Sequence, residues 1–130
     1  MKIAVTANGQ DLDAPTSPIF GRCPTYILVD TETMQYEAVA NPAIGASGGA
    51  GIQAAQYITG LGVEAILSGN VGPNAYGVLS AAGVPVYLYD GGTVRQAVEA
   101  YNAGELQAQR GPSGPAHAGM GRGGGRGRGR

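Results

Sequence analysis

In the second half of the chain, short apolar segments alternate with segments of helical periodicity, and this alternation limits the folds that the chain can adopt. Glu64–Ser68 (EAILS) and Pro85–Tyr89 (PVYLY) have the length and composition of buried strands. Pro73–Ala82 and Thr93–Asn102 carry apolar residues at helical spacing, and the second begins with a capping box formed by Thr93 and Gln96. A strand, a helix and a further strand form a crossover, which makes the two strands parallel. The pattern therefore predicts an α/β fold.

The first half of the chain predicts strands that are joined by short connections. Lys2–Ala7 (KIAVTA) and Thr25–Asp30 (TYILVD) are rich in apolar residues, and Gln35–Ala40 (QYEAVA) alternates with a period of two. A tight turn at 31–33 should make the last two of these strands antiparallel. Gly48–Thr59 (GGAGIQAAQYIT) then predicts the first helix, because its alanines and isoleucine recur at helical spacing.

The predicted order is thus β-β-β-α-β-α-β-α. The simplest arrangement is a mixed five-stranded sheet in which only the second strand is antiparallel, with helices on both faces. We expect a three-layer α/β/α fold with the strand order of ribonuclease-H-like proteins. The acidic metal cluster on the strands of those nucleases has no counterpart here, so nuclease chemistry is not expected.

In this arrangement, the segments of unusual composition meet at one edge of the sheet. Open α/β sheets bind ligands at the carboxyl ends of their parallel strands, where the strand order reverses. The segments that reach this edge are Asn8–Phe20, Gly21–Pro24, Asn41–Gly51, Gly69–Asn74 and Asp90–Gly92.

The chemistry of this edge suits an anion that contains a thiophilic metal. Glycines precede three helix starts, each of which carries about half a positive charge. Arg22 adds a full charge, and Cys23 adds a soft sulfur whose thiolate Arg22 and the helix starts should favour. Structural alternatives remain open: glycines at ordinary turns, Cys23 as a small buried hydrophobe, and Arg22 paired with Asp11, Asp13 or Asp30.

Composition divides the chain into a folded domain over residues 1–110 and a disordered tail over 111–130. The tail holds nine glycines and two prolines but no Leu, Ile, Val or aromatic residue. The domain has nine acidic and four basic residues, a net charge of −5, whereas the tail has four arginines. With one cysteine, no signal peptide and no apolar run of membrane-spanning length, we expect a cytoplasmic protein.

Several enzyme classes are not expected. The one histidine, His117, lies in the tail, so the domain cannot form a Cys–His pair or a Ser–His–Asp triad. Residues 48–51 lack the Lys-Ser/Thr of a phosphate-binding Walker loop, and no zinc-site spacing of Cys and His occurs.

Three stretches carry a resemblance to a known family: FGRCPTYILVD, GGAGIQAA and SGNVGPNAYGVLSAAGVPVY. Together they resemble the dinitrogenase iron–molybdenum cofactor biosynthesis family, in its small, single-domain, orange-protein-like branch. The resemblance covers nearly all of residues 1–105. It implies the ribonuclease-H-like fold above and a protein that is not an enzyme. The implied ligand is a metal–sulfur cluster or its precursor, containing molybdenum and in some cases iron or copper.

The resemblance also implies a set of binding residues. Several relatives have a histidine just before the Phe-Gly-Arg stretch, where this chain has Pro18 and Ile19. This leaves Cys23 as the metal ligand in the domain, or His117 from the tail. The other implied cluster-binding residues are Phe20, Gly21, Arg22, Gly48, Gly49, Gly69, Asn70, Gly72, Pro73 and Asn74.

Three functional hypotheses follow. The first is a carrier or storage protein for an anionic metal–sulfur cluster, with a protein partner that donates or receives it. The second is a regulatory adaptor that binds a partner ATPase and uses no cofactor. The third is weak RNA binding by Gly121–Arg130 (GRGGGRGRGR), which lacks the aromatic residues that strengthen such binding. Membrane binding is not expected.

Overall fold

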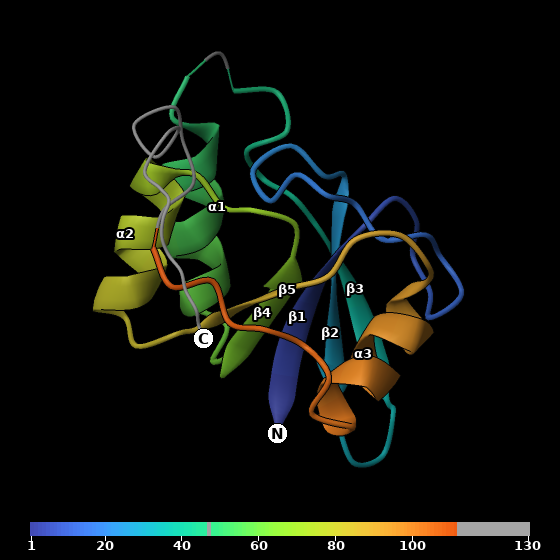
Figure 1. Cartoon of the computed structure of the whole chain (residues 1–130). Helices are drawn as coiled ribbons and strands as arrows, with labels where there is room; N and C mark the ends of the chain where they lie inside the picture. Colours follow the sequence, from blue (N-terminus) through green and yellow to red (C-terminus); the bar gives the residue numbers. More distant parts are fainter. Residues whose placement is uncertain (47, 112–130) are drawn as a thin grey trace.

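The computed structural model describes residues 1–46 and 48–111 of the chain. Its elements follow the predicted order β-β-β-α-β-α-β-α (Figure 1). The predicted disordered tail lies, apart from Gly111, outside the described residues, as does His117. The elements are β1 (Lys2–Ala7), β2 (Thr25–Asp30), β3 (Tyr36–Ala40), α1 (Ala50–Thr59), β4 (Ala65–Ser68), α2 (Pro73–Ala81), β5 (Val86–Leu88) and α3 (Val94–Asn102).

The five strands form one mixed sheet in the order β3-β2-β1-β4-β5. β2 is antiparallel to both of its neighbours, with Ile27 opposite Val5 on one side and Ala38 on the other. β1 pairs with β4 and β4 with β5 in parallel. The predicted arrangement, in which only the second strand is antiparallel, is therefore confirmed. The carboxyl ends of the four parallel strands share one edge, at the top of Figure 1.

Helices cover both faces of the sheet, which gives the three predicted layers (Figure 1). The side chains of β1 contribute to the hydrophobic core on both faces of the sheet, because successive side chains of a strand point in opposite directions. Ile3 and Val5 pack with Val94 and Val98 of α3, whereas Ala4 belongs to the core beneath α1 and α2.

The helix boundaries follow from local chemistry. α1 begins two residues later than predicted, because Gly49 has a φ of 71°, a left-handed conformation that cannot continue a helix. α3 begins with the predicted capping box, in which the side chains of Thr93 and Gln96 each accept a hydrogen bond from the other's backbone N–H.

Residues 107–111 form a segment that no sequence pattern predicted, and we call it the C-terminal strap. It runs antiparallel along β5, where Gln107 O accepts from Leu88 N (2.9 Å) and Gln109 N donates to Val86 O (2.8 Å). In Figure 1 this orange segment crosses in front of β5 and reaches α2. The strap thus covers the outer edge of the sheet and ends beside α2.

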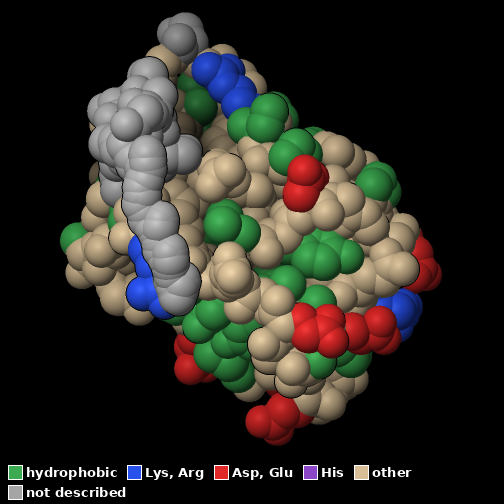
Figure 2. Space-filling model, in the orientation of Figure 1, with side chains coloured by type: hydrophobic (Ala, Val, Ile, Leu, Met, Phe, Trp, Pro, Cys, Tyr) green, Lys and Arg blue, Asp and Glu red, His purple; other side chains and the backbone are tan. Residues whose placement is uncertain are grey.

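Within the described residues, no helix is both long enough and apolar enough to cross a bilayer. On the face shown in Figure 2, most of the acidic side chains lie around α3, in the lower right of the view.

Candidate functional site

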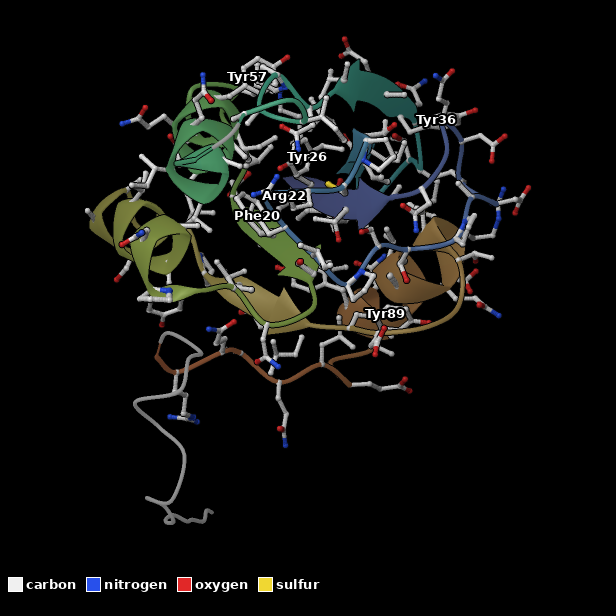
Figure 3. All side chains as sticks on the ribbon, turned by 90° about the horizontal axis from the view of Figure 1, so that it is seen from above. Phe20, Arg22, Tyr26, Tyr36, Tyr57 and Tyr89 are labelled. Atoms are coloured by element: carbon white, nitrogen blue, oxygen red, sulfur yellow. The ribbon has the colours of Figure 1, made fainter. Side chains whose placement is uncertain are left out.

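A cavity of about 270 Å³ lies at the carboxyl edge of the sheet, between the first turns of α1 and α2. Three stretches line it: residues 19–22 of the loop between β1 and β2, residues 49–52 at the start of α1, and residues 70–75 at the start of α2. Seen from above, Phe20 and Arg22 lie next to each other beside α1, whereas Tyr36 and Tyr89 lie far from this place (Figure 3). The topology therefore brings together segments that are about 20 to 50 residues apart in sequence.

Most of the sequence-predicted binding residues line this cavity. Gly48 does not line it but precedes Gly49, and Gly69 lines a neighbouring hollow with Pro18 and Asp90. What this geometry establishes is that the residues are neighbours; their role in binding remains a prediction. The predicted residues that line the cavity are Phe20, Gly21, Arg22, Gly49, Asn70, Gly72, Pro73 and Asn74.

Close backbone contacts explain why two of these positions are glycine. A Cβ at Gly69 would lie 2.3 Å from the carbonyl oxygen of Pro18, a backbone atom that has no room to move. A Cβ at Gly21 would lie 3.0 Å from the backbone of Gly51 in α1. These contacts hold the loop between β1 and β2 tightly against β4 and α1.

The N-termini of α1 and α2 both reach the cavity without a side-chain cap. Gly49 and Gly72 are the N-cap residues, and neither can supply a capping side chain. Pro73 occupies the first turn of α2, where its missing N–H costs no helical hydrogen bond. Two sets of first-turn N–H groups and two helix dipoles therefore lie at one cavity, an arrangement that favours an anion.

Among the described residues, Arg22 is the one charged residue of the lining, and it pairs with none of Asp11, Asp13 and Asp30. Its Nη1 lies 3.4 Å from the carbonyl oxygen of Ala46. Within residues 1–46 and 48–111, the one ion pair joins Arg95 to Asp13 (3.2 Å). Asp30 instead accepts backbone hydrogen bonds from the turn after β2, which lower the pKa of its carboxyl. The guanidinium is exposed at the cavity and has no carboxylate partner among the described residues.

Cys23 differs from the sequence expectation in the acidity of its thiol. The side chain is 1% exposed and donates a weak hydrogen bond to Phe20 O (3.5 Å). Burial away from water raises the pKa of the thiol to about 11, although a hydrogen bond with Tyr26 opposes part of this rise. The expectation that Arg22 and the helix starts favour the thiolate is therefore wrong. Ligation of a metal by Cys23 remains a prediction, and Cys23 does not line the cavity.

Asn41 holds the Phe20–Cys23 loop, a role that the sequence did not indicate. Its Nδ2 donates to Gly21 O (3.1 Å) and to Cys23 O (2.8 Å), while its Oδ1 accepts from Ala43 N (2.8 Å). Asn41 is 3% exposed, so these bonds are shielded from water. The Asn-Pro pair predicted only the end of a strand, because the two carbonyls that accept from the Asn41 side chain lie about 20 residues away in sequence.

Gln109 is a second residue that sequence reasoning missed. From the C-terminal strap, its side-chain amide hydrogen-bonds to both the N–H and the carbonyl of Val71, a residue of the cavity lining. Nothing in the local sequence around residue 109 signals this contact, because the two residues are 38 positions apart.

The described residues contain no group of three or more His, Cys, Asp or Glu side chains placed to hold a metal ion. None of these four types occurs among the described residues that line the cavity. Backbone N–H groups, two asparagines and an arginine therefore dominate the polar chemistry of the lining.

Fold and site together define a small α/β protein with a cavity at the topological switch point of its sheet, between two uncapped helix N-termini. The chain belongs to the dinitrogenase iron-molybdenum cofactor family, which it matches over residues 1–104. The resemblance seen in the sequence is thus confirmed.

Similarity to individual proteins supports the membership of this chain in the family. The apo form of the orange protein from Desulfovibrio gigas is 43% identical, with a TM-score of 0.83 over 87% of this chain and 96% of the other. A protein from Thermotoga, solved by NMR, is 38% identical, with a TM-score of 0.72 over 82% of this chain and 91% of the other. An uncharacterized protein of Methanocaldococcus jannaschii is 32% identical over 110 residues, 82% of this chain and 90% of its own length.

Proposed function

We propose that this protein binds an anionic metal–sulfur cluster or its precursor in the cavity between α1 and α2, and carries or stores it without catalysing a reaction. The observation that supports this most directly is the joint placement of two uncapped helix N-termini and Arg22 around one cavity. Each favours negative charge, and among the described residues no carboxylate lines the cavity to oppose them.

The donor set favours a preformed anion over a bare metal ion. Soft metal ions need thiolate or imidazole ligands, and the described residues of the lining offer neither. A thiometallate already has its metal coordinated by sulfide, and its sulfur atoms accept hydrogen bonds from N–H groups. Retention would then depend on charge and hydrogen bonds alone. Membership of the dinitrogenase iron-molybdenum cofactor family favours molybdenum as the metal, with copper or iron as a second metal.

The test is an anaerobic titration of the full chain with tetrathiomolybdate, with and without Cu(I). We expect new visible absorbance together with backbone amide shifts confined to residues 19–22, 49–52 and 70–75. Arg22→Ala should weaken binding about tenfold at low ionic strength, because a charge-assisted contact is lost, and less at high salt.

Arg95→Ala is the matched control for this variant. It removes the same charge from an exposed ion pair with Asp13, away from the cavity, and should leave binding unchanged. Equal weakening by both variants would show that only net charge matters and would refute the cavity as the site.

An adaptor function is the second candidate, and one observation favours it. Ile19 and Ile44 are 55% and 49% exposed, although both are large apolar side chains in loops at the carboxyl edge. Such residues suit contact with a protein partner. The same edge would serve delivery of a cluster to a recipient protein. Absence of any absorbance or amide shift in the titration would favour the adaptor that uses no cofactor.

A further inference from the structure

Gln109 connects the C-terminal strap to the loop that lines the candidate anion site. The residue is 8% exposed, and every hydrogen-bonding atom of its side-chain amide has a partner. Oε1 accepts from Val71 N (2.9 Å), while Nε2 donates to Val71 O (2.8 Å) and to Gly111 O (2.7 Å). These partners fix the orientation of the amide, because exchanging its oxygen and nitrogen would place donor against donor.

The backbone of Gln109 is anchored as firmly as its side chain. Its N–H donates to Val86 O (2.8 Å) in β5, and its carbonyl accepts from the Tyr76 hydroxyl (3.0 Å) in α2. The amide is therefore held between two elements while it contacts the loop between β4 and α2. This arrangement makes Gln109 a rigid support for that loop.

The contact with Val71 determines where the next N–H group points. All described peptide bonds are trans, and in a trans peptide the carbonyl and the N–H point in opposite directions. Gln109 holds the Val71 carbonyl on its own side of the loop, so the Gly72 N–H is directed to the other side. Gly72 lines the cavity and is the N-cap residue of α2, and no described residue accepts a hydrogen bond from its N–H.

We propose that Gln109 is a positioning residue of the anion site, which holds the Val71–Gly72 peptide so that the Gly72 N–H faces the bound anion. This inference rests on the proposed function. It extends the site beyond the residues that line the cavity, to a strap that lies more than 30 residues further along the chain. Loss of the amide removes the hydrogen bond to the carbonyl of this peptide and the one from the N–H of the preceding peptide. The Gly72 N–H is then no longer preorganised for the anion.

The experiment compares two variants of Gln109 with the same substitutions at Gln107. Gln107 is an exposed residue of the strap whose side chain has no hydrogen-bond partner among the described residues. Gln109→Leu removes both contacts with Val71. Gln109→Glu keeps the size and the acceptor for Val71 N–H but replaces the donor with a carboxylate oxygen. Gln107→Leu and Gln107→Glu control for apolar surface and for added negative charge.

We expect both Gln109 variants to bind tetrathiomolybdate about tenfold more weakly than the parent, and both Gln107 variants to bind it within twofold of the parent. Hydrogen exchange without ligand provides an independent measurement. The Val71 amide should exchange faster in Gln109→Leu than in the parent, while amides of β1 and β4 keep their protection. Gln109→Glu, which keeps the acceptor, serves if Gln109→Leu does not fold.

The two proposals fail in different ways. If the parent does not bind tetrathiomolybdate, the proposed function is overturned, and the positioning role falls with it. If the parent binds and Gln109→Leu binds equally well despite faster exchange at Val71, only the positioning role is overturned. Equal weakening by the Gln109 and Gln107 variants also overturns it, because the effect would then belong to the strap as a whole.

Discussion

Cys23 shows, at the scale of single residues, that burial can control the acidity of a thiol even where an arginine precedes it in the sequence. Its sequence neighbour Arg22 is exposed at the cavity, whereas the Cys23 side chain points into the core, where Phe20 and Tyr26 pack against each other with ring centroids 5.4 Å apart. The thiol is thus separated from water, and its neutral form is stabilised. The same burial raises the pKa of Tyr26.

The raised pKa of Cys23 predicts how stability depends on pH. The unfolded chain ionises the thiol near pH 9, and the folded chain near 11, so the native state binds more protons between these values. Stability is therefore fully present below pH 9 and falls as the pH rises towards 11, by about 2 kcal/mol in total. Urea unfolding from pH 7 to 11 should show this fall in the parent.

Cys23→Ala removes the titrating group and should flatten this part of the pH profile, whatever it does to stability at pH 7. Tyrosines ionise in both the parent and the Cys23→Ala variant, so their contribution largely cancels when the two pH profiles of unfolding free energy are subtracted. Parallel profiles for parent and variant would contradict the burial argument.

The roles of some single residues could be predicted from the sequence, whereas those of others could not. Arg22 and the glycines at helix starts were identifiable because their chemistry is local: a charge, or a turn before a helix. The acidity of Cys23 could not be predicted from the sequence, because it depends on how Phe20 and Tyr26 pack around the thiol in the core. The role of Gln109 could not be predicted either, because its side-chain amide contacts a residue 38 positions earlier and the local sequence carries no sign of this contact.

At the scale of elements, α2 and the loop before it contain two glycines with opposite roles. Gly69 ends β4 against the Pro18 carbonyl, where a Cβ would lie 2.3 Å from backbone oxygen. Gly77 lies on the exposed side of α2, and a Cβ there would meet nothing within 4 Å. One glycine is required by a close approach, whereas the other only weakens a helix.

This contrast predicts opposite effects of the same substitution. Gly77→Ala should raise the free energy of unfolding by about 0.5–1 kcal/mol, because alanine restricts the unfolded chain and favours the helix. Gly69→Ala should lower it by about 1–3 kcal/mol, because the loop at 18 must move away. Urea unfolding of both variants tests this pair, and a stabilised Gly69→Ala variant would contradict the close contact.

The secondary-structure elements were predicted more accurately than the roles of single residues. All eight appear within two residues of their predicted bounds, because apolar periodicity and helix caps are local signals. The C-terminal strap was not predicted, because Gln107–Gln109 has neither alternating apolar residues nor a helix cap. The segment is extended because it pairs with the open edge of β5.

At the scale of the whole molecule, the charges are divided along the chain. Residues 1–110 carry nine acidic and four basic side chains, and the remaining four arginines all follow residue 120. All buried residues of the described ranges lie at or before Gln109.

Deletion of residues 112–130 should therefore leave the urea midpoint of unfolding unchanged. The shortened chain keeps Gly111, whose carbonyl accepts a hydrogen bond from Gln109. A lower midpoint would show that the deleted residues stabilise the domain. The same pair of proteins tests RNA binding: affinity that the deletion abolishes and that falls steeply with salt would support phosphate contacts by the arginines.

The direction of β1 has a practical consequence. Met1 lies at the end of the sheet opposite to the cavity, next to the turn after β2 and close to Tyr101 of α3. A dye, an affinity handle or a surface linker attached at Met1 would therefore leave the rim around Phe20 and Arg22 accessible. An attachment at residue 111 would lie on the strap that supports the Val71 loop, at the residue whose carbonyl accepts from Gln109. Single-molecule or immobilised assays of cluster transfer should be built from the amino end.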